Sequence, residues 1–148
     1  MKRIFLLIVA ILATSALLIS CNNGSSASNG DGGKKLIISL ETNPTTGFDW
    51  QYEFANGSSL KLEDAKEEVN NKDGMVGAPI LRHYTFSAEK QGDVTLKFTY
   101  KRNWEGGDTA YSLVYKINVD SNNNIKVLSE TLEGNISGSV MKHSYTYE

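Results

Sequence analysis

Apolar side chains recur at every second position through the middle of the chain, which is the spacing of half-buried β-strands. The clearest run is 48–54, where Phe48, Trp50, Tyr52 and Phe54 alternate with polar residues. Further runs with the same alternation lie at 36–41, 84–88, 94–101 and 111–119. Since neighbouring runs are joined by short polar connections, the pattern predicts antiparallel strands.

The segment 60–69 fits two interpretations. Leu60, Lys61 and Leu62 begin like a strand, whereas residues 63–69 also suit a turn of helix. With this segment the chain has six short strands and no convincing helix of three turns. Such a content predicts an all-β sandwich, whose domain we place at residues 34–120. Residues 34–148 are enough to bury one modest core.

The remaining residues, 121–148, are mostly polar, and we expect them to form a C-terminal extension with one or two edge strands. Asp120, Asn122 and Asn124 have the spacing of the first ligands of a calcium loop. Ile125, however, occupies the position where that loop requires glycine. We therefore expect no metal site here.

Composition excludes several classes of function. The chain has 15 Lys and Arg against 17 Asp and Glu and no basic run, which argues against nucleic-acid binding. A single cysteine allows neither an internal disulfide nor a zinc ribbon. His83 and His143 lie far apart in the sequence, and neither has a recognisable catalytic or metal-ligating companion. We expect no cofactor, no metal and a monomeric state.

The N-terminus has the features of a secretory signal. Two positive charges, Lys2 and Arg3, precede a short uncharged stretch. Its end, Leu-Ile-Ser-Cys at 18–21, resembles the lipobox of bacterial lipoproteins. The resemblance implies removal of residues 1–20 and lipidation of Cys21, with the domain held at a bacterial membrane and facing the periplasm or the cell exterior. The alternatives are an ordinary signal with a chance cysteine, or an uncleaved anchor.

Residues 21–33 are predicted to link the anchor to the domain. After Cys21 they contain only Asn, Gly, Ser, Ala and Asp, so they have no apolar side chains to bury. Such a composition favours a flexible tether that holds a domain away from the membrane. With Cys21 lipidated, no thiol remains for catalysis.

The connections between the predicted strands differ in composition. If successive strands alternate in direction, the connections 43–47, 70–79 and 102–108 emerge at one end of the sandwich. They hold both prolines, an exposed apolar pair and a tryptophan, whereas the connections at the other end have ordinary tight-turn composition. The asymmetry predicts a binding edge of three loops on a rigid scaffold.

Each of the three loops has a binding interpretation and a plainer alternative. Pro44 would stiffen the first loop and Gly47 would let it turn sharply, but a plain turn has the same composition. In the second loop, glycines allow close approach to a partner, while a mobile surface loop is equally compatible. In the third, Arg102 beside Trp104 is typical of an interface anchor, unless Trp104 folds over the core.

Three segments together carry a family resemblance. Residues 43–50 (NPTTGFDW), the glycine pair at 74 and 77, and residues 100–105 (YKRNWE) match the chagasin family of cysteine-protease inhibitors in order and spacing. The resemblance covers about residues 36–119. It implies an immunoglobulin-like antiparallel β-sandwich with three binding loops at one end. The activity it implies is reversible, non-covalent, competitive inhibition of papain-like proteases, without enzymatic activity.

The resemblance also implies roles for single residues. The loop 43–47 would cover the catalytic cysteine of the protease, the other two loops would hold its flanks, and Trp104 would stack on an aromatic surface. The implied protease contacts are Asn43, Pro44, Thr45, Thr46, Gly47, Gly74, Met75, Val76, Gly77, Arg102, Asn103 and Trp104. At position 103 the family usually has proline, so Asn103 implies a less stiff third loop and lower affinity.

Two other function classes remain in view. A membrane-anchored surface or adhesion lipoprotein would use the same sandwich without inhibiting any protease. A hydrolase would need a nucleophile and a base, and the chain contains neither G-x-S-x-G nor H-E-x-x-H.

Overall fold

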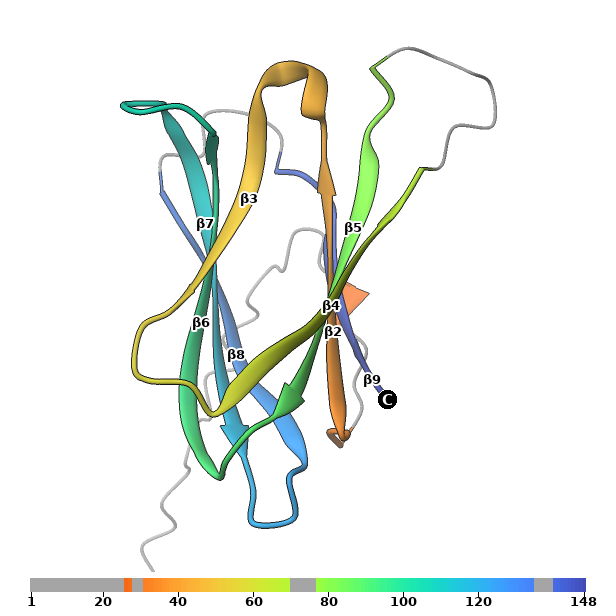
Figure 1. Cartoon of the computed structure of the whole chain (residues 1–148), viewed down its shortest axis with the longest axis vertical. Coiled ribbons are helices and arrows are strands. Elements are labelled where there is room, and N and C mark those ends of the chain that lie inside the picture. Colours follow the sequence, from red (N-terminus) through yellow and green to blue (C-terminus); the bar gives the residue numbers. More distant parts are fainter. Residues whose placement is uncertain (1–25, 28–30, 70–76, 135–139) are drawn as a thin grey trace, which may run out of the picture.

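Two β-sheets pack face to face in the computed structural model, which describes residues 26–27, 31–69, 77–134 and 140–148 (Figure 1). The strands are β1 (Ser26–Ala27), β2 (Lys35–Thr42), β3 (Phe48–Phe54), β4 (Leu60–Glu68), β5 (Ile80–Ala88), β6 (Gly92–Arg102), β7 (Thr109–Val119), β8 (Ile125–Glu133) and β9 (His143–Tyr147). One sheet has the order β1-β9-β2-β5-β4 and the other β3-β6-β7-β8. All pairings of these strands are antiparallel except that of β1 with β9. The predicted immunoglobulin-like antiparallel sandwich is confirmed.

The ambiguous segment 60–69 forms a strand, so the helical interpretation of its second half is wrong. β4 pairs with β5 from Leu60 to Glu68, with a bulge between Leu62 and Asp64. Beyond the bulge most side chains are exposed and charged, because β4 is an edge strand of its sheet. Charges and a bulge at an edge discourage pairing with other chains, and they also hide the apolar alternation by which strands are recognised.

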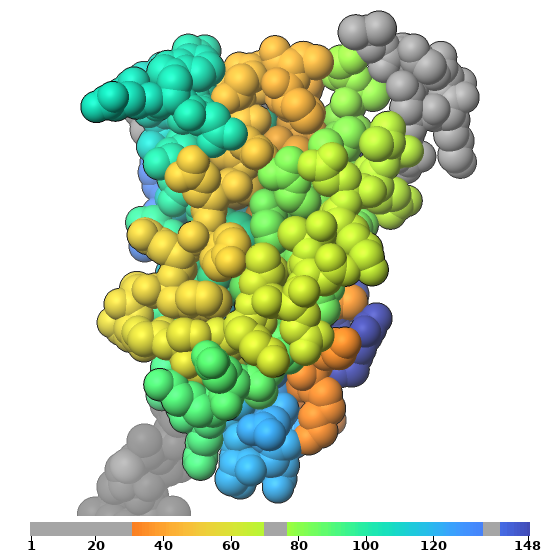
Figure 2. Space-filling model, viewed as in Figure 1, coloured from red at the N-terminus to blue at the C-terminus, as the bar shows by residue number. Residues whose placement is uncertain are grey.

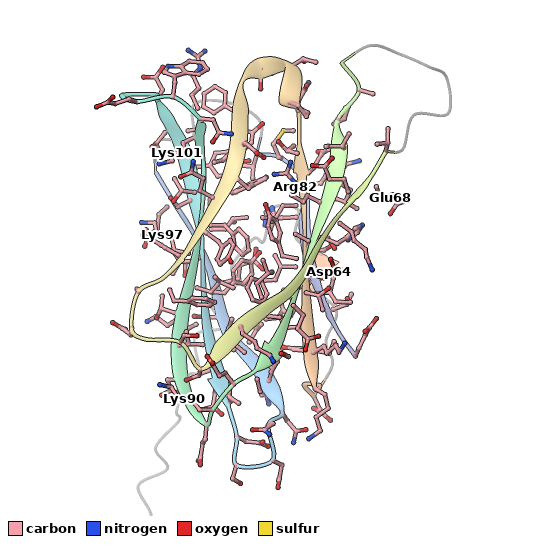
Figure 3. The ribbon with its side chains drawn as sticks, in the orientation of Figure 1. Asp64, Glu68, Arg82, Lys90, Lys97 and Lys101 are labelled. Atoms are coloured by element: carbon pink, nitrogen blue, oxygen red, sulfur yellow. The ribbon has the colours of Figure 1, made fainter. Side chains whose placement is uncertain are left out.

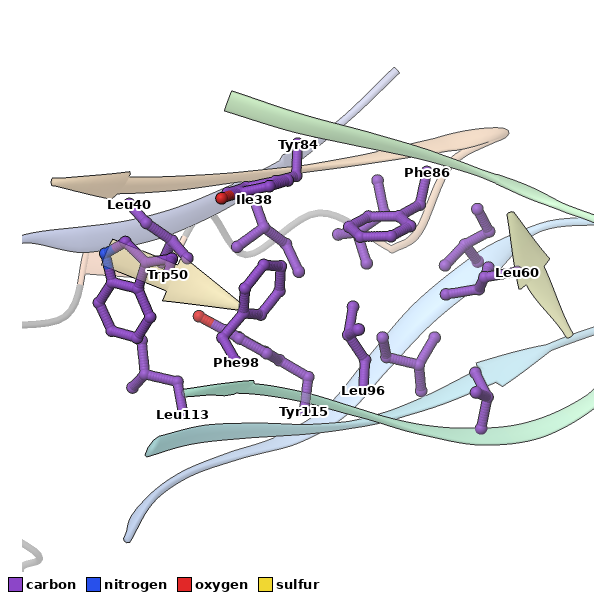
Figure 4. Close-up of a cluster of buried hydrophobic side chains, with 14 of the residues drawn as sticks. Ile38, Leu40, Trp50, Leu60, Tyr84, Phe86, Leu96, Phe98, Leu113 and Tyr115 are labelled. Atoms are coloured by element: carbon purple, nitrogen blue, oxygen red, sulfur yellow. The ribbon is translucent and has the colours of Figure 1, made fainter. Parts of the chain in front are cut away.

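The core lies between the sheets and consists of the inward positions that the alternation predicts (Figure 4). Fully buried side chains come from both sheets: Leu36, Ile38, Leu40, Leu60, Phe86, Leu96, Phe98, Leu113, Tyr115, Val119 and Ile125. Tyr52 departs from the prediction and is 37% exposed, because β3 is an edge strand. Its ring still makes edge contacts with Tyr84 and Phe86 of the opposite sheet.

Residues 121–148 supply one strand to each sheet. β8 extends the sheet of β3, β6 and β7, while β9 lies between β1 and β2. Ile125 at the start of β8 is fully buried in the core. The extension therefore contributes to the hydrophobic core of the sandwich as well as to its sheets.

Two described parts of the predicted tether are paired with the sandwich. Ser26 and Ala27 form β1 beside β9, and the backbone of Gly33 exchanges two hydrogen bonds with Ile125, at 3.1 and 2.7 Å. A stretch without apolar side chains can pair in this way because the bonds use only backbone groups. The predicted signal segment 1–20 and Cys21 lie outside the described residues.

The turn between β7 and β8 explains the calcium-like spacing. The Asp120 carboxylate accepts hydrogen bonds from the backbone N–H groups of Asn122 and Asn124 and from the Asn124 side chain, each at 2.8 Å. These bonds lower the pKa of Asp120. The pattern is therefore that of an Asx-stabilised turn. No group of three or more metal-ligating side chains occurs within the described ranges.

Helices long and apolar enough to span a bilayer do not occur in the described part of the chain.

An ion pair joins the two sheets along one flank. His143 Nε2 of β9 lies 2.8 Å from Glu130 Oε1 of β8, and His143 Nδ1 lies 3.1 Å from the carbonyl oxygen of Met141. Both ring nitrogens thus face acceptors, which favours the doubly protonated, cationic imidazolium. The hydrogen bond with Glu130 raises the pKa of His143 above its ordinary value, and burial opposes this only in part.

This pair predicts a pH-dependent stability. Because the pKa of His143 is higher in the folded than in the unfolded chain, its stabilising contribution is complete below about pH 6.5 and is lost as the pH rises through the folded value. We expect urea unfolding of wild type to show a lower free energy at pH 9 than at pH 6. His143→Gln should remove about 1–3 kcal/mol at pH 6 and flatten this dependence. Glu130→Gln should flatten it too, and an unchanged pH dependence in both variants would contradict the prediction.

Candidate functional site

The three compositionally distinctive connections share one end of the sandwich (Figure 1). They join β2 to β3, β4 to β5 and β6 to β7. The connections β3–β4, β5–β6 and β7–β8 lie at the opposite end. This arrangement confirms that the three loops occupy one end, as the alternation of strand direction predicts. Gly74, Met75 and Val76 of the second loop lie outside the described residues.

The first loop is a short 3₁₀ turn, η1 (Pro44–Thr46), held by its own polar groups. Asn43 Oδ1 accepts hydrogen bonds from Thr45 N at 3.2 Å and Thr45 Oγ1 at 2.6 Å. The carbonyl oxygen of Asn43 accepts from Thr46 N and Oγ1, at 3.1 and 2.7 Å. Gly47 ends the turn with φ 75°, a left-handed conformation that favours glycine. Pro44, Thr45 and Thr46 are exposed at the tip of this capped turn.

Asn43 also joins the first loop to the second. Its Nδ2 donates a hydrogen bond of 3.2 Å to the carbonyl oxygen of Gly77, the first described residue after the second loop's central part. One side chain therefore caps η1 with its oxygen and ties the neighbouring loop with its nitrogen. In the space-filling view, residues 43–47 lie between the third loop and the residues that follow the second (Figure 2).

The third loop lies against the first through Trp104. A Cβ placed on Gly47 would be 2.8 Å from Cζ3 of the Trp104 ring, so the indole packs directly over this glycine. Trp104 is 55% exposed and does not belong to the core cluster. The alternative in which Trp104 folds over the core is therefore wrong.

Arg102 lies beneath the same ring. Its guanidinium carbon is 5.0 Å from the centroid of the Phe48 ring and 5.2 Å from that of Trp104. The loop itself is closed by backbone hydrogen bonds from Arg102 N to Asp108 O (3.0 Å) and from Gly107 N to Trp104 O (2.9 Å). Trp104 thus projects from a closed loop and rests on the side chain of Arg102.

Asn103, where the family usually has proline, has a support of its own. Its Oδ1 accepts a hydrogen bond of 2.9 Å from Nε2 of Gln51 on β3. Both side chains are exposed, so we expect a modest contribution of about 0.5–1.5 kcal/mol. This bond offsets part of the stiffness that a proline ring would supply.

The base of the loops is held by a charged cluster between the sheets. Arg82 of β5, labelled in Figure 3, forms ion pairs with Asp49 of β3 at 2.6 Å and with Glu67 of β4. Burial on its own would lower the pKa of Arg82, but the bonds to both carboxylates raise it above its ordinary value. The first loop leads into the start of β3. The cluster fixes this point relative to β4 and β5, the strands on either side of the second loop.

Several of these supporting residues were not among the predicted site residues. Phe48 and Arg82 lie in strands, and only a three-dimensional contact reveals their role. Gln51 has the outward position of a half-buried strand, which by itself indicates no function. For Phe48, the sequence offers one indication of a role at the site: it directly follows the loop 43–47.

Both histidines have hydrogen-bonding partners in the structure. His83 Nδ1 lies 2.7 Å from Ser39 Oγ, and His83 Nε2 lies 3.3 Å from Glu68 Oε2. Three adjacent strands place these side chains together, which no sequence spacing indicates. Ser39 is nevertheless buried in the middle of β2 and paired on both sides, with His83 and Ser144. The ladders on both sides occupy the nearby backbone N–H groups, so none remains to stabilise an oxyanion.

Comparisons with known proteins show the family of the chain. The sequence model of a protein family, described as chagasin family peptidase inhibitor I42, matches residues 31–119 of this chain. The chain belongs to this family. Amoebiasin-2 of Entamoeba histolytica is 35% identical over 83 residues, which are 55% of this chain and 68% of amoebiasin-2. Chagasin of Trypanosoma cruzi is 30% identical over 79 residues, which are 50% of this chain and 70% of chagasin.

A solved structure supports the same assignment. The crystal structure of the cysteine protease inhibitor EhICP2 from Entamoeba histolytica matches with a TM-score of 0.53 and 28% identity, covering 66% of this chain and 85% of that one. The family consists of inhibitors, so the chain is not an enzyme and the hydrolase hypothesis is excluded. β8 and β9 lie beyond the matched residues.

Proposed function

We propose that the chain is a reversible, non-covalent, competitive inhibitor of papain-like cysteine proteases that blocks the active-site cleft with its three loops. The observation that carries the proposal is the arrangement of the exposed tip. Thr45 and Thr46 project from a capped turn, with Trp104 on one side and Gly77 on the other. A narrow central wedge with a contact on each flank fits a cleft.

The hydrogen bonds of the first loop support inhibition without turnover. η1 is held by bonds to both Asn43 Oδ1 and Asn43 O, so little conformational freedom remains to be lost on binding. A 3₁₀ turn is also not the extended backbone in which a protease presents a peptide bond for cleavage. We therefore expect a wedge that enters the cleft intact and leaves it intact.

Each loop has its own role in this proposal. The loop 43–47 covers the catalytic cysteine of the protease, the segment Gly74, Met75, Val76 and Gly77 contacts one flank, and Arg102, Asn103 and Trp104 contact the other. An exposed tryptophan next to an arginine has the composition of an interface hot spot. We expect an interface of about 1,600 Å², the standard size for protease inhibitors.

The proposal is tested by titrating papain with residues 22–148, a chain that lacks Cys21 and retains every described residue. We expect competitive, reversible loss of activity at nanomolar to micromolar concentrations, with the inhibitor recovered uncleaved. Trypsin, a serine protease, is the control and should be unaffected. Absence of inhibition of papain and of a cathepsin-L-type enzyme would overturn the proposal and favour the surface-adhesion alternative.

We also propose that the chain is exported and attached to a bacterial membrane through lipidated Cys21, as a monomer whose sandwich faces the periplasm or the cell exterior. The lipobox-like residues 18–21 support this. In a bacterial host, wild type should fractionate with membranes and incorporate labelled palmitate. Cys21→Ser should do neither, and palmitate incorporation by that variant would contradict the assignment of Cys21.

A further inference from the structure

We infer that Arg102 is a positioning residue: its guanidinium, stacked between Phe48 and Trp104, holds the indole over Gly47 so that the third loop meets the protease preformed. The inference rests on the proposed function, because it assumes that Trp104 contacts the protease. Arg102 then supports the indole of Trp104. It changes the role that the family resemblance implies for Arg102, from protease contact to internal support.

The contacts of Arg102 point inward to the loop. The guanidinium carbon lies about equally far from two aromatic rings, 5.0 Å from the Phe48 centroid and 5.2 Å from the Trp104 centroid. Phe48 is itself fixed from below, because its ring stacks on that of Tyr100 at 5.3 Å between centroids. A continuous stack therefore runs from the buried ring of Tyr100 to the exposed ring of Trp104, with Phe48 and Arg102 between them.

The polar groups of Arg102 agree with this role. Nε is buried and makes no hydrogen bond to any described residue. The ion pair with Asp108 is long, at 3.8 Å, and the Asp108 side chain is largely exposed, so it holds the guanidinium weakly. The two aromatic rings are therefore the main contacts that set the plane of the guanidinium.

The orientation of the Trp104 indole depends on the plane of the Arg102 guanidinium. Its ring is separate from the core cluster, and both Gly47 and the guanidinium of Arg102 lie against it. Glycine offers no side chain to confine the ring. Without the guanidinium the indole would sample several rotamers, and binding would have to select one of them at a cost in entropy.

Arg102→Lys separates stacking from charge. Lysine keeps the positive charge but has no planar group to insert between two rings. If Arg102 acted through its charge on the protease, lysine would largely replace it. If Arg102 acts through the stack, lysine would fail.

The experiment uses the chain 22–148 and two readouts. The first needs no protease: the two tryptophans give two indole N–H signals in NMR, and Trp50, which is buried, serves as the internal reference. We expect Arg102→Lys to lower the heteronuclear NOE of the Trp104 indole and leave that of Trp50 unchanged. The second readout is the inhibition constant for papain, which we expect to rise about tenfold.

Two further variants complete the test. Asp108→Asn removes the ion pair but leaves the stack, so both readouts should stay at wild-type values. Phe48→Leu removes the lower ring. The double variant Phe48→Leu/Arg102→Lys should have the same inhibition constant as whichever single variant inhibits papain less well, because both changes break the same stack. Urea unfolding checks that each variant is folded; if Phe48→Leu does not fold, Arg102→Lys and Asp108→Asn still decide.

The outcomes separate the possibilities. Weaker inhibition by Arg102→Lys with an unchanged Trp104 signal would show a direct contact of Arg102 with the protease and overturn the inference. Unchanged inhibition and an unchanged signal would overturn it as well. If wild type does not inhibit papain, the proposed function fails, while the Trp104 signal in Arg102→Lys still decides whether Arg102 positions the indole.

Discussion

Replacing Trp104 by alanine is expected to weaken inhibition of papain by about 30- to 1,000-fold, the range of a hot-spot residue. The free energy of unfolding should change by less than about 0.5 kcal/mol, because the side chain is exposed and does not belong to the core cluster. The measurement is the inhibition constant from competitive titration, together with urea unfolding of the free variant. A large loss of binding with an intact fold would identify Trp104 as an anchor of the interface.

Leu128→Ala is the matched control. Leu128 is as exposed as Trp104, at 59% against 55%, but it lies on β8, away from the three loops. Removing it tests whether loss of any exposed apolar side chain affects inhibition, and we expect no change. Equal inhibition constants for Trp104→Ala and wild type would refute the assignment of the third loop to the interface.

The strands and the placement of the loops were predictable from the sequence, for a simple reason. The strand at 94–101 buries Val94, Leu96, Phe98 and Tyr100 on one face, so apolar side chains recur at every second position and the alternation is visible in the sequence. Because successive strands alternate in direction, the first, third and fifth connections emerge at one end of the sandwich and the others at the opposite end. The edge strand β4 was ambiguous because most of its residues beyond the bulge are charged and exposed.

The contacts that assemble the loops were not predictable. Asn43 and Gly77 are 34 positions apart, and Gln51 and Asn103 are 52 apart, so no local pattern relates them. The same holds for Ser39, His83 and Glu68, which three neighbouring strands bring together. The sequence indicated which loops meet, but the side-chain hydrogen bonds and stacking that hold them depend on strand register and on the distance between the sheets.

Gly47→Ala is expected to weaken inhibition by about 100-fold, although it adds a single methyl group. With φ at 75°, a side chain at this position strains the backbone by about 1–2 kcal/mol, which urea unfolding should detect. The new Cβ would also lie 2.8 Å from the Trp104 ring, closer than Cβ atoms approach other atoms, so the indole must move. The variant should therefore lose both a favourable turn and the placement of the anchor.

Gly57→Ala separates these two effects. Gly57 has a similar φ of 69° but open space around its Cβ, and it lies in the β3–β4 connection at the opposite end. It should lose similar stability and keep wild-type inhibition. In a Trp104→Ala background, Gly47→Ala should still destabilise the fold but weaken inhibition by a smaller factor, because no indole remains to be displaced. Equal further losses of inhibition in both backgrounds would mean that Gly47 contributes through the first loop alone, and not through its contact with Trp104.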